Sequence, residues 1–88
     1  MARPTRCRRI CMEPAYDSFF PGGVLTGEEV IMTLDEYETI RLIDLEEYTQ
    51  HECAKQMNIS RTTAAEIYKS ARYKMADSIV NGKKLLIT

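Results

Sequence analysis

The sequence has no tryptophan, only four glycines and three prolines, and no long apolar run. The low glycine and proline content excludes collagen-like and low-complexity chains. The absence of about 20 consecutive apolar residues predicts that no helix spans a membrane. The N-terminus leads directly into arginines and lacks the apolar centre of a signal peptide. We therefore expect a cytoplasmic protein with no membrane partner.

Residues that could support catalysis or metal binding are scarce. The chain has one histidine and three cysteines, with no glycine-rich phosphate loop and no nucleophile motif. An odd number of cysteines is typical of free thiols in a reducing compartment. Cys7 and Cys11 are candidates for a metal or redox site. His51 and Cys53 would point about 200° apart on a helix, so they could meet the same metal only if His51 sat in an unwound first turn. We therefore expect no enzyme activity and no cofactor, and interpret Cys53 as a small buried hydrophobe.

Length and composition predict one small globular domain. The chain has 88 residues, of which 44% are hydrophobic and 28% charged, too few for a large catalytic cleft. The net charge of -1 conceals a strong polarity, since residues 1–11 carry +4, residues 12–52 carry -10 and residues 53–88 carry +5. Such a chain can present a basic face to phosphate while its acidic face stays in solvent.

A capping box predicts the start of the first helix. Thr33 and Glu36 have the spacing of a box that satisfies the first amides of a helix beginning at Leu34. The predicted solvent side of this helix consists of Asp35, Glu36, Glu38, Glu46 and Glu47. The apolar residues Ile40, Leu42, Ile43 and Leu45 form a broad stripe that suits either the core or a dimer surface.

The next segment has the pattern of a helix-turn-helix. A second capping box predicts a short helix from Gln50 to about Met57, and Asn58 tolerates the left-handed backbone of a sharp turn. Ser60 then caps a long helix that runs from Arg61 to about Val80, before Asn81-Gly82 stops it. The order short helix, tight turn and long helix is that of DNA-binding helix-turn-helix domains. The alternative is a helical hairpin that only packs.

The long helix is predicted to expose a DNA-reading face. If Ala64 and Ile67 face the core, a rotation of about 100° per residue turns a polar row outward. Arginine can donate to guanine, threonine offers a hydroxyl or methyl group, and glutamate can accept from cytosine. The predicted DNA-binding residues are Ser60, Arg61, Thr62, Thr63, Glu66, Lys69 and Arg72, with Arg3 and Arg6 on an N-terminal arm. The arm arginines could instead be solvated or pair with the acidic middle of the chain.

Three short segments share the format of two like charges followed by three apolar residues. They span residues 8–12, 28–32 and 83–87, and the middle one is acidic. Pairing of the acidic strand between the two basic strands, in parallel or near-parallel registers, would align opposite charges. The alternative is frayed termini. The predicted fold is mainly α (α+β), a tri-helical domain over 33–82, with a basic arm, strands and loop in 1–32 and a strand in 83–88, forming one domain overall.

The sequence also resembles a known family. The runs MARPTRCRRIC and VIMTLDEYETIRLIDLEEYTQHECAKQMNISRTTAAEIYKSARYKMADSIVNGKKLLI resemble the uncharacterised prokaryotic family of small predicted DNA-binding proteins with a helix-turn-helix similar to sigma factor region four. The resemblance covers almost the whole chain and implies a winged or tri-helical reader of promoter-like DNA. It implies a motif core at Ala54, Ile59, Ser60, Arg61, Thr62, Ala71 and Arg72. Asn58 departs from the glycine that such turns often carry.

The function expected from these patterns is sequence-specific binding of double-stranded DNA by a transcriptional regulator. A small reader makes few phosphate contacts, so we expect a homodimer that spans half-sites about 34 Å apart. One alternative is an adaptor whose acidic middle segment binds a partner from the transcription machinery, such as a polymerase subunit. Another is a thiol or metal sensor coupled to DNA binding.

Overall fold

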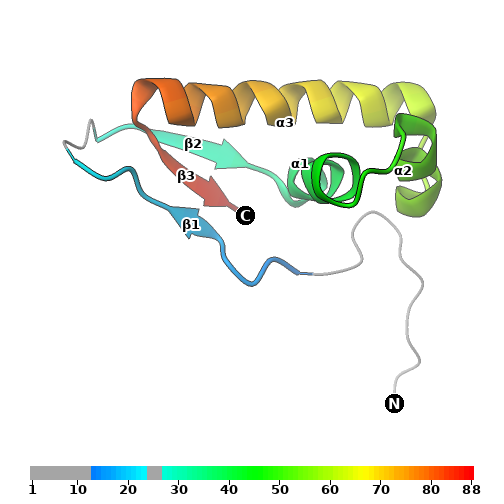
Figure 1. Ribbon diagram of the computed structural model, residues 1–88, viewed down its shortest axis with the longest axis horizontal. Helices are drawn as coiled ribbons and strands as arrows, with labels where there is room; N and C mark the ends of the chain where they lie inside the picture. Colours follow the sequence, from blue (N-terminus) through cyan, green and yellow to red (C-terminus); the bar gives the residue numbers. More distant parts are fainter. Residues whose placement is uncertain (1–12, 24–26) are drawn as a thin grey trace, which may run out of the picture.

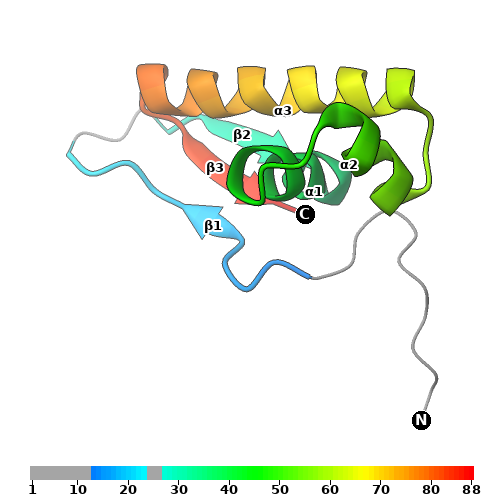
Figure 2. The same cartoon turned by 45° about the vertical axis from the view of Figure 1, so that its right-hand side comes forward.

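The computed structural model describes residues 13–23 and 27–88 of the chain. The elements are β1 (Ser18–Phe19), β2 (Glu29–Met32), α1 (Leu34–Thr39), η1 (Ile40–Leu45), α2 (Gln50–Met57), α3 (Arg61–Asn81) and β3 (Lys84–Ile87). Helix α3 runs along one edge of the molecule, and the sheet and the other helices lie to one side of it (Figures 1 and 2). None of the described helices is both long and apolar enough to cross a membrane. The predicted mixed class, three helical segments with a small sheet, is confirmed.

The sheet joins segments that are far apart in the sequence. Its strand order is β1-β3-β2, with β1 antiparallel and β2 parallel to β3. The parallel register places Glu29 opposite Lys84, and their side chains form an ion pair of 3.3 Å. Lys83 similarly approaches Glu28 at 3.6 Å. The charged pairs therefore align as the sequence predicts for the second and third of the three segments.

The composition of the sheet differs from the prediction in two ways. Within the described ranges the basic strand β3 is central, whereas the acidic strand was expected between two basic ones. The antiparallel neighbour of β3 is β1, a two-residue strand that the sequence pattern did not indicate. Two residues are too short to show an alternation of apolar and polar side chains. The first predicted strand, residues 8–12, lies outside the described residues.

The described residues form two core clusters. Met32, Ala71 and Ile87 form one cluster, which joins the sheet to the middle of α3. Leu42, Cys53 and Met57 form the other, beneath the helix-turn-helix. The alanines Ala54 and Ala64 are also buried, and their small side chains allow α2 and α3 to approach closely.

The first predicted helix changes type halfway along its length. It is α-helical in α1 and becomes a π-helix in η1, which ends where the Glu46 amide donates to the Arg41 carbonyl at 3.0 Å. The wider turns of a π-helix shift side chains relative to the α-helical period. Leu42 is consequently buried in the core while Leu45 is 73% exposed. The apolar stripe of this helix therefore does not form one continuous dimer surface, and that alternative is wrong for Leu42.

The helix-turn-helix follows the sequence prediction closely. Thr49 and Glu52 form the second capping box, and α2 ends at Asn58 in the left-handed conformation, with φ 62° and ψ 45°. Ser60 caps α3, which ends at left-handed Gly82. Asparagine thus occupies the backbone conformation for which many such turns use glycine.

Substitution of Asn58 tests the left-handed backbone conformation at the turn between α2 and α3. We expect Asn58→Gly to preserve stability or raise it slightly, because glycine adopts positive φ without steric cost. Asn58→Val should lower the free energy of unfolding by about 1 to 2 kcal/mol, because a β-branched residue clashes in this conformation. Urea unfolding followed by circular dichroism measures both. Equal stability of the two variants would contradict the left-handed assignment.

Candidate nucleic-acid interface

Four of the predicted DNA-binding residues are exposed on α3. Arg61, Thr62, Glu66 and Lys69 are all exposed, and no other described element lies over this side of α3 (Figures 1 and 2). The face is produced by the burial of Ala64 and Ala71 on the opposite side of the same helix. Neither Arg61 nor Lys69 forms an ion pair within residues 13–23 and 27–88, so both are available to an anionic ligand.

Ser60 and Thr63 shape the start of α3. The Thr63 amide donates to Ser60 Oγ at 3.0 Å, and Ser60 Oγ donates to Thr63 Oγ1 at 2.8 Å. Both hydroxyls are therefore used within the cap. The amides at the helix start, rather than the Ser60 hydroxyl, are the groups suited to a phosphate.

Arg72 is held by a neighbouring tyrosine. Arg72 donates from Nη1 to the Tyr68 hydroxyl at 3.0 Å, and its guanidinium lies 5.5 Å from the centre of the Tyr68 ring. Tyr68 in turn donates to Asp44 Oδ1 at 2.7 Å. The hydrogen bond to Asp44, together with burial, raises the pKa of Tyr68, so the hydroxyl stays protonated. Arg72 is exposed but fixed in direction, as a positioned phosphate-binding arginine would be.

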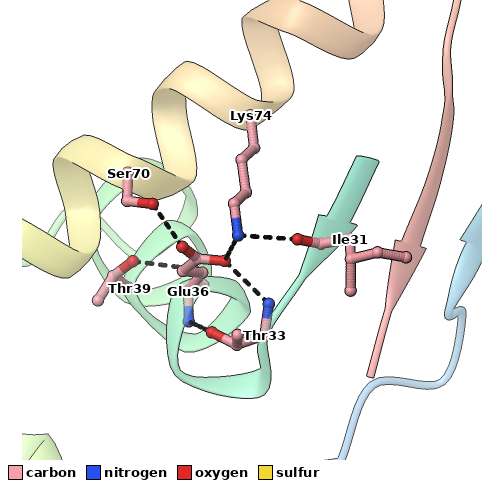
Figure 3. A network of polar contacts seen from close by, with 6 residues as sticks. All are labelled: Ile31, Thr33, Glu36, Thr39, Ser70 and Lys74. Carbon is pink, nitrogen blue, oxygen red and sulfur yellow. Dashed lines mark hydrogen bonds and ion pairs between the residues drawn. The ribbon is translucent and has the colours of Figure 1, made fainter. Parts of the chain in front are cut away.

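A network around Glu36 attaches α3 to the rest of the molecule (Figure 3). Glu36 accepts from the Thr33 amide at 2.9 Å, from Lys74 Nζ at 2.8 Å and from Ser70 Oγ at 2.6 Å. Lys74 Nζ also donates to the Ile31 carbonyl at 2.8 Å. One carboxylate thus connects α1 with α3, and the lysine adds β2, which fixes the rotation of α3 about its axis.

Glu36 was predicted on the solvent side of its helix, and that prediction is wrong. Glu36 is only 7% exposed. Burial by itself raises the pKa of a carboxyl group, but the hydrogen bonds from Lys74, Ser70 and the Thr33 amide outweigh that effect, so the pKa of Glu36 lies below its usual value. Glu36 is therefore ionised in the folded protein at neutral pH.

Glu38 was also predicted to face solvent and is instead fully buried. Arg41 donates to it in a bidentate manner, from Nε to Oε1 at 3.0 Å and from Nη2 to Oε2 at 2.9 Å. The hydrogen bond to Glu38 raises the pKa of Arg41. The pair joins α1 to the π-helical segment, so a buried charge is compensated where the helix changes type.

Two of the four candidate residues for a thiol or metal site, His51 and Cys53, lie in the described part of the chain. Cys53 is fully buried, as predicted, and burial raises the pKa of its thiol, which makes it a poor nucleophile. His51 is exposed at the start of α2. Within the described part of the chain, no group of three or more histidine, cysteine or acidic residues could hold a metal ion. Cys7 and Cys11, like Arg3 and Arg6, lie outside the described residues.

Comparisons with known proteins place the chain in a family. The family model described as "Protein of unknown function DUF134" matches residues 1–88. The chain belongs to the DUF134 family. A UPF0251 protein of Desulfitobacterium hafniense is 54% identical over 99% of this chain and 71% of its own length. UPF0251 proteins of Thermoanaerobacter pseudethanolicus and Aeromonas salmonicida are 47% and 44% identical, over 75% and 87% of their lengths and 99% of this chain. No solved structure matches the chain.

In this DUF134 chain, the structure thus groups most of the residues that were predicted as a site. Four side chains share the open face of α3, two form its cap, and Arg72 lies further along the same helix. Tyr68 and Asp44, which hold Arg72, were not predicted because they are 24 residues apart in the sequence. The four-residue spacing of Tyr68 and Arg72 on a helix was the one local signal.

Proposed function

We propose that this protein is a sequence-specific DNA-binding protein, acting as a transcriptional regulator, that places the N-terminal half of α3 in the major groove. The observation that carries the proposal is that Arg61, Thr62, Glu66 and Lys69 are all exposed on α3, whose outer side no other described element covers (Figure 1). The short helix, left-handed turn and long helix have the order of a helix-turn-helix. The resemblance to sigma factor region four supports the same proposal, which assigns the protein a binding role and no catalytic one.

The chemistry of the face suits both parts of DNA recognition. Arg61, Thr62 and Glu66 have the side chains that read base edges, and they lie in the first two turns of α3, the part of a recognition helix that enters the groove. Lys69 lies further along and can neutralise a phosphate. Arg72, directed by Tyr68, suits a second phosphate. The cap amides at the helix start complete a backbone contact.

We also propose that the protein binds DNA as a homodimer. One recognition helix contacts few base pairs, and two copies on half-sites about 34 Å apart would gain the affinity that specific binding requires. Sedimentation of the chain with a palindromic duplex is expected to show two copies for each DNA molecule. One copy for each duplex at saturation would show that the reader acts as a monomer.

Salt dependence tests the proposed DNA contacts directly. We expect random-sequence duplex DNA to bind at low ionic strength and to dissociate steeply as salt rises from about 50 to 200 mM. Lys69→Ala should reduce the slope of log affinity against log salt by about 0.9, because one fewer counterion is released. Fluorescence anisotropy with a labelled duplex gives both slopes.

Lys84→Ala is the matched control for this experiment. Lys84 lies on β3 and not on the outer face of α3, and its charge is paired with Glu29, so its removal should leave the slope unchanged. If neither random nor genomic DNA binds at low salt, the DNA-binding proposal is wrong. Equal slopes for the Lys69 and Lys84 variants would contradict the placement of the interface on α3.

A further inference from the structure

An open groove runs along α1 and η1. One of its two hollows, about 250 Å³, is lined only by apolar groups, among them Phe19, Tyr37, Ile40 and Leu85. The other, about 340 Å³, is lined by Tyr37, Ile40, Arg41, Asp44 and Leu45. The two hollows are adjacent, since Tyr37 and Ile40 border both, and they are here together called the α1–η1 groove. Its two walls are the helical segment on one side and the β1–β3 side of the sheet on the other.

Exposed apolar side chains lie at both ends of the α1–η1 groove. Leu45 is 73% exposed at one end, and Phe19 and its neighbour Phe20 are exposed at the other. Single exposed apolar residues are ordinary, but several of them around an apolar depression mark an interaction surface. The groove thus has what a docking site requires, an apolar floor and projecting apolar edges.

The charge at the Leu45 end of the groove is acidic. Asp44, Glu46 and Glu47 flank Leu45 and are all exposed. The one cation among the lining residues, Arg41, is neutralised by its bidentate pair with buried Glu38, and it also forms an ion pair of 3.8 Å with Glu46. The described groove therefore combines an apolar floor with a negative rim at its Leu45 end.

We propose that the α1–η1 groove binds a basic amphipathic helix of a partner protein. Such a helix places apolar side chains on one face, at spacings of three and four residues, and these would fill the two hollows in succession. Lysine or arginine residues beside that face would meet the acidic rim, and this charge complementarity selects a basic helix over an acidic one. The inference goes beyond DNA binding and does not depend on it.

The location of the groove allows it to be occupied while α3 is bound to DNA. Strand β1, which supplies Phe19, lies at the opposite edge of the molecule from α3 (Figures 1 and 2). Met75 of α3 lines the floor of the groove, on the inward side of that helix. The two surfaces of α3 therefore have separate roles, the outer one open and the inner one part of the groove.

A synthetic peptide serves as the probe. We expect a labelled helical peptide of about 18 residues, with leucines on one face and lysines on the other, to bind the full chain, and a version with glutamate in place of lysine to bind at least about tenfold more weakly. In nitrogen-15 correlation spectra, the shifts should concentrate at the amides of Ile40–Leu45 and around Phe19. Shifts centred on Thr62–Lys69, or equal binding of the two peptides, would overturn the proposal.

Two exposed positions locate the site without endangering the fold. Leu45→Gln removes an apolar edge, and Glu47→Lys reverses a rim charge; each should weaken binding of the lysine peptide by about fivefold or more. Val80→Gln, the same kind of change as Leu45→Gln at an exposed position near the C-terminal end of α3, is the matched control and should leave the affinity unchanged. If all three variants bind like the parent, the proposal is wrong. Self-association of the chain alone that Leu45→Gln abolishes would assign the groove to a second copy instead.

Discussion

Replacing Arg41 by methionine is expected to lower the free energy of unfolding by about 3 kcal/mol. Glu38 is fully buried, and Arg41 supplies two of its hydrogen bonds. Methionine retains much of the apolar stem of the arginine but none of its charge, so the change leaves a buried carboxylate without its main compensation. Urea unfolding followed by circular dichroism measures the difference.

Two variants separate this effect from a general loss of arginine. Arg72→Met removes an exposed arginine that contacts Tyr68, and it should change the free energy of unfolding by less than about 0.5 kcal/mol. The double variant Glu38→Gln with Arg41→Met should recover part of the loss, because no unpaired buried charge remains. A loss in Arg41→Met no larger than in Arg72→Met would show that the Glu38 pair does not stabilise the fold.

The helix boundaries could be predicted because their signals are local. Each capping box lies within four residues, and the structure forms both, with Thr33 bonded to Glu36 and Thr49 to Glu52. Asn58 and Gly82 end their helices in the left-handed conformation that their side chains tolerate best. Such features require no knowledge of the tertiary fold, so a single sequence is sufficient to find them.

The environments of the acidic residues in α1 could not be predicted for the opposite reason. Amphipathic patterning places a glutamate on the solvent side unless its partner is known. The partner of Glu36 is Lys74, 38 residues later, and only the packing of α3 on α1 brings them together. Arg41 is only three residues from Glu38, a spacing at which helical side chains can pair, but the burial of Glu38 depends on tertiary packing that the sequence pattern does not show.

The candidate interface could be predicted from the sequence only in part. Its face could be predicted because α3 is one continuous helix whose inner side is fixed by Ala64 and Ala71. The positioning of Arg72 by Tyr68 and Asp44 required the docking of α3 against η1, a contact between distant segments. Periodicity therefore locates a surface, while the contacts that orient its side chains come from tertiary structure.

Removal of the Glu36 charge is expected to change how stability depends on pH. Glu36→Gln should lower the free energy of unfolding by about 2 kcal/mol at neutral pH, because Lys74 loses its buried partner. The pKa of Glu36 is lowered in the folded state, so its contribution is fully present above the unfolded pKa of about 4.3 and is lost as pH falls through the folded pKa. The parent should therefore lose more stability on acidification than Glu36→Gln, and the two should converge at low pH.

Unfolding by urea at several pH values between about 2 and 7 tests this convergence. Glu47→Gln is the matched control, since Glu47 is exposed at the end of η1, and its pH profile should follow the parent. If Glu36→Gln runs parallel to the parent over the whole range, the ion pair does not supply the pH dependence. Because Glu36 and Lys74 join α1, β2 and α3, convergence of the two proteins at acid pH would show that this carboxylate, when ionised, stabilises the packing of α3 on the rest of the molecule.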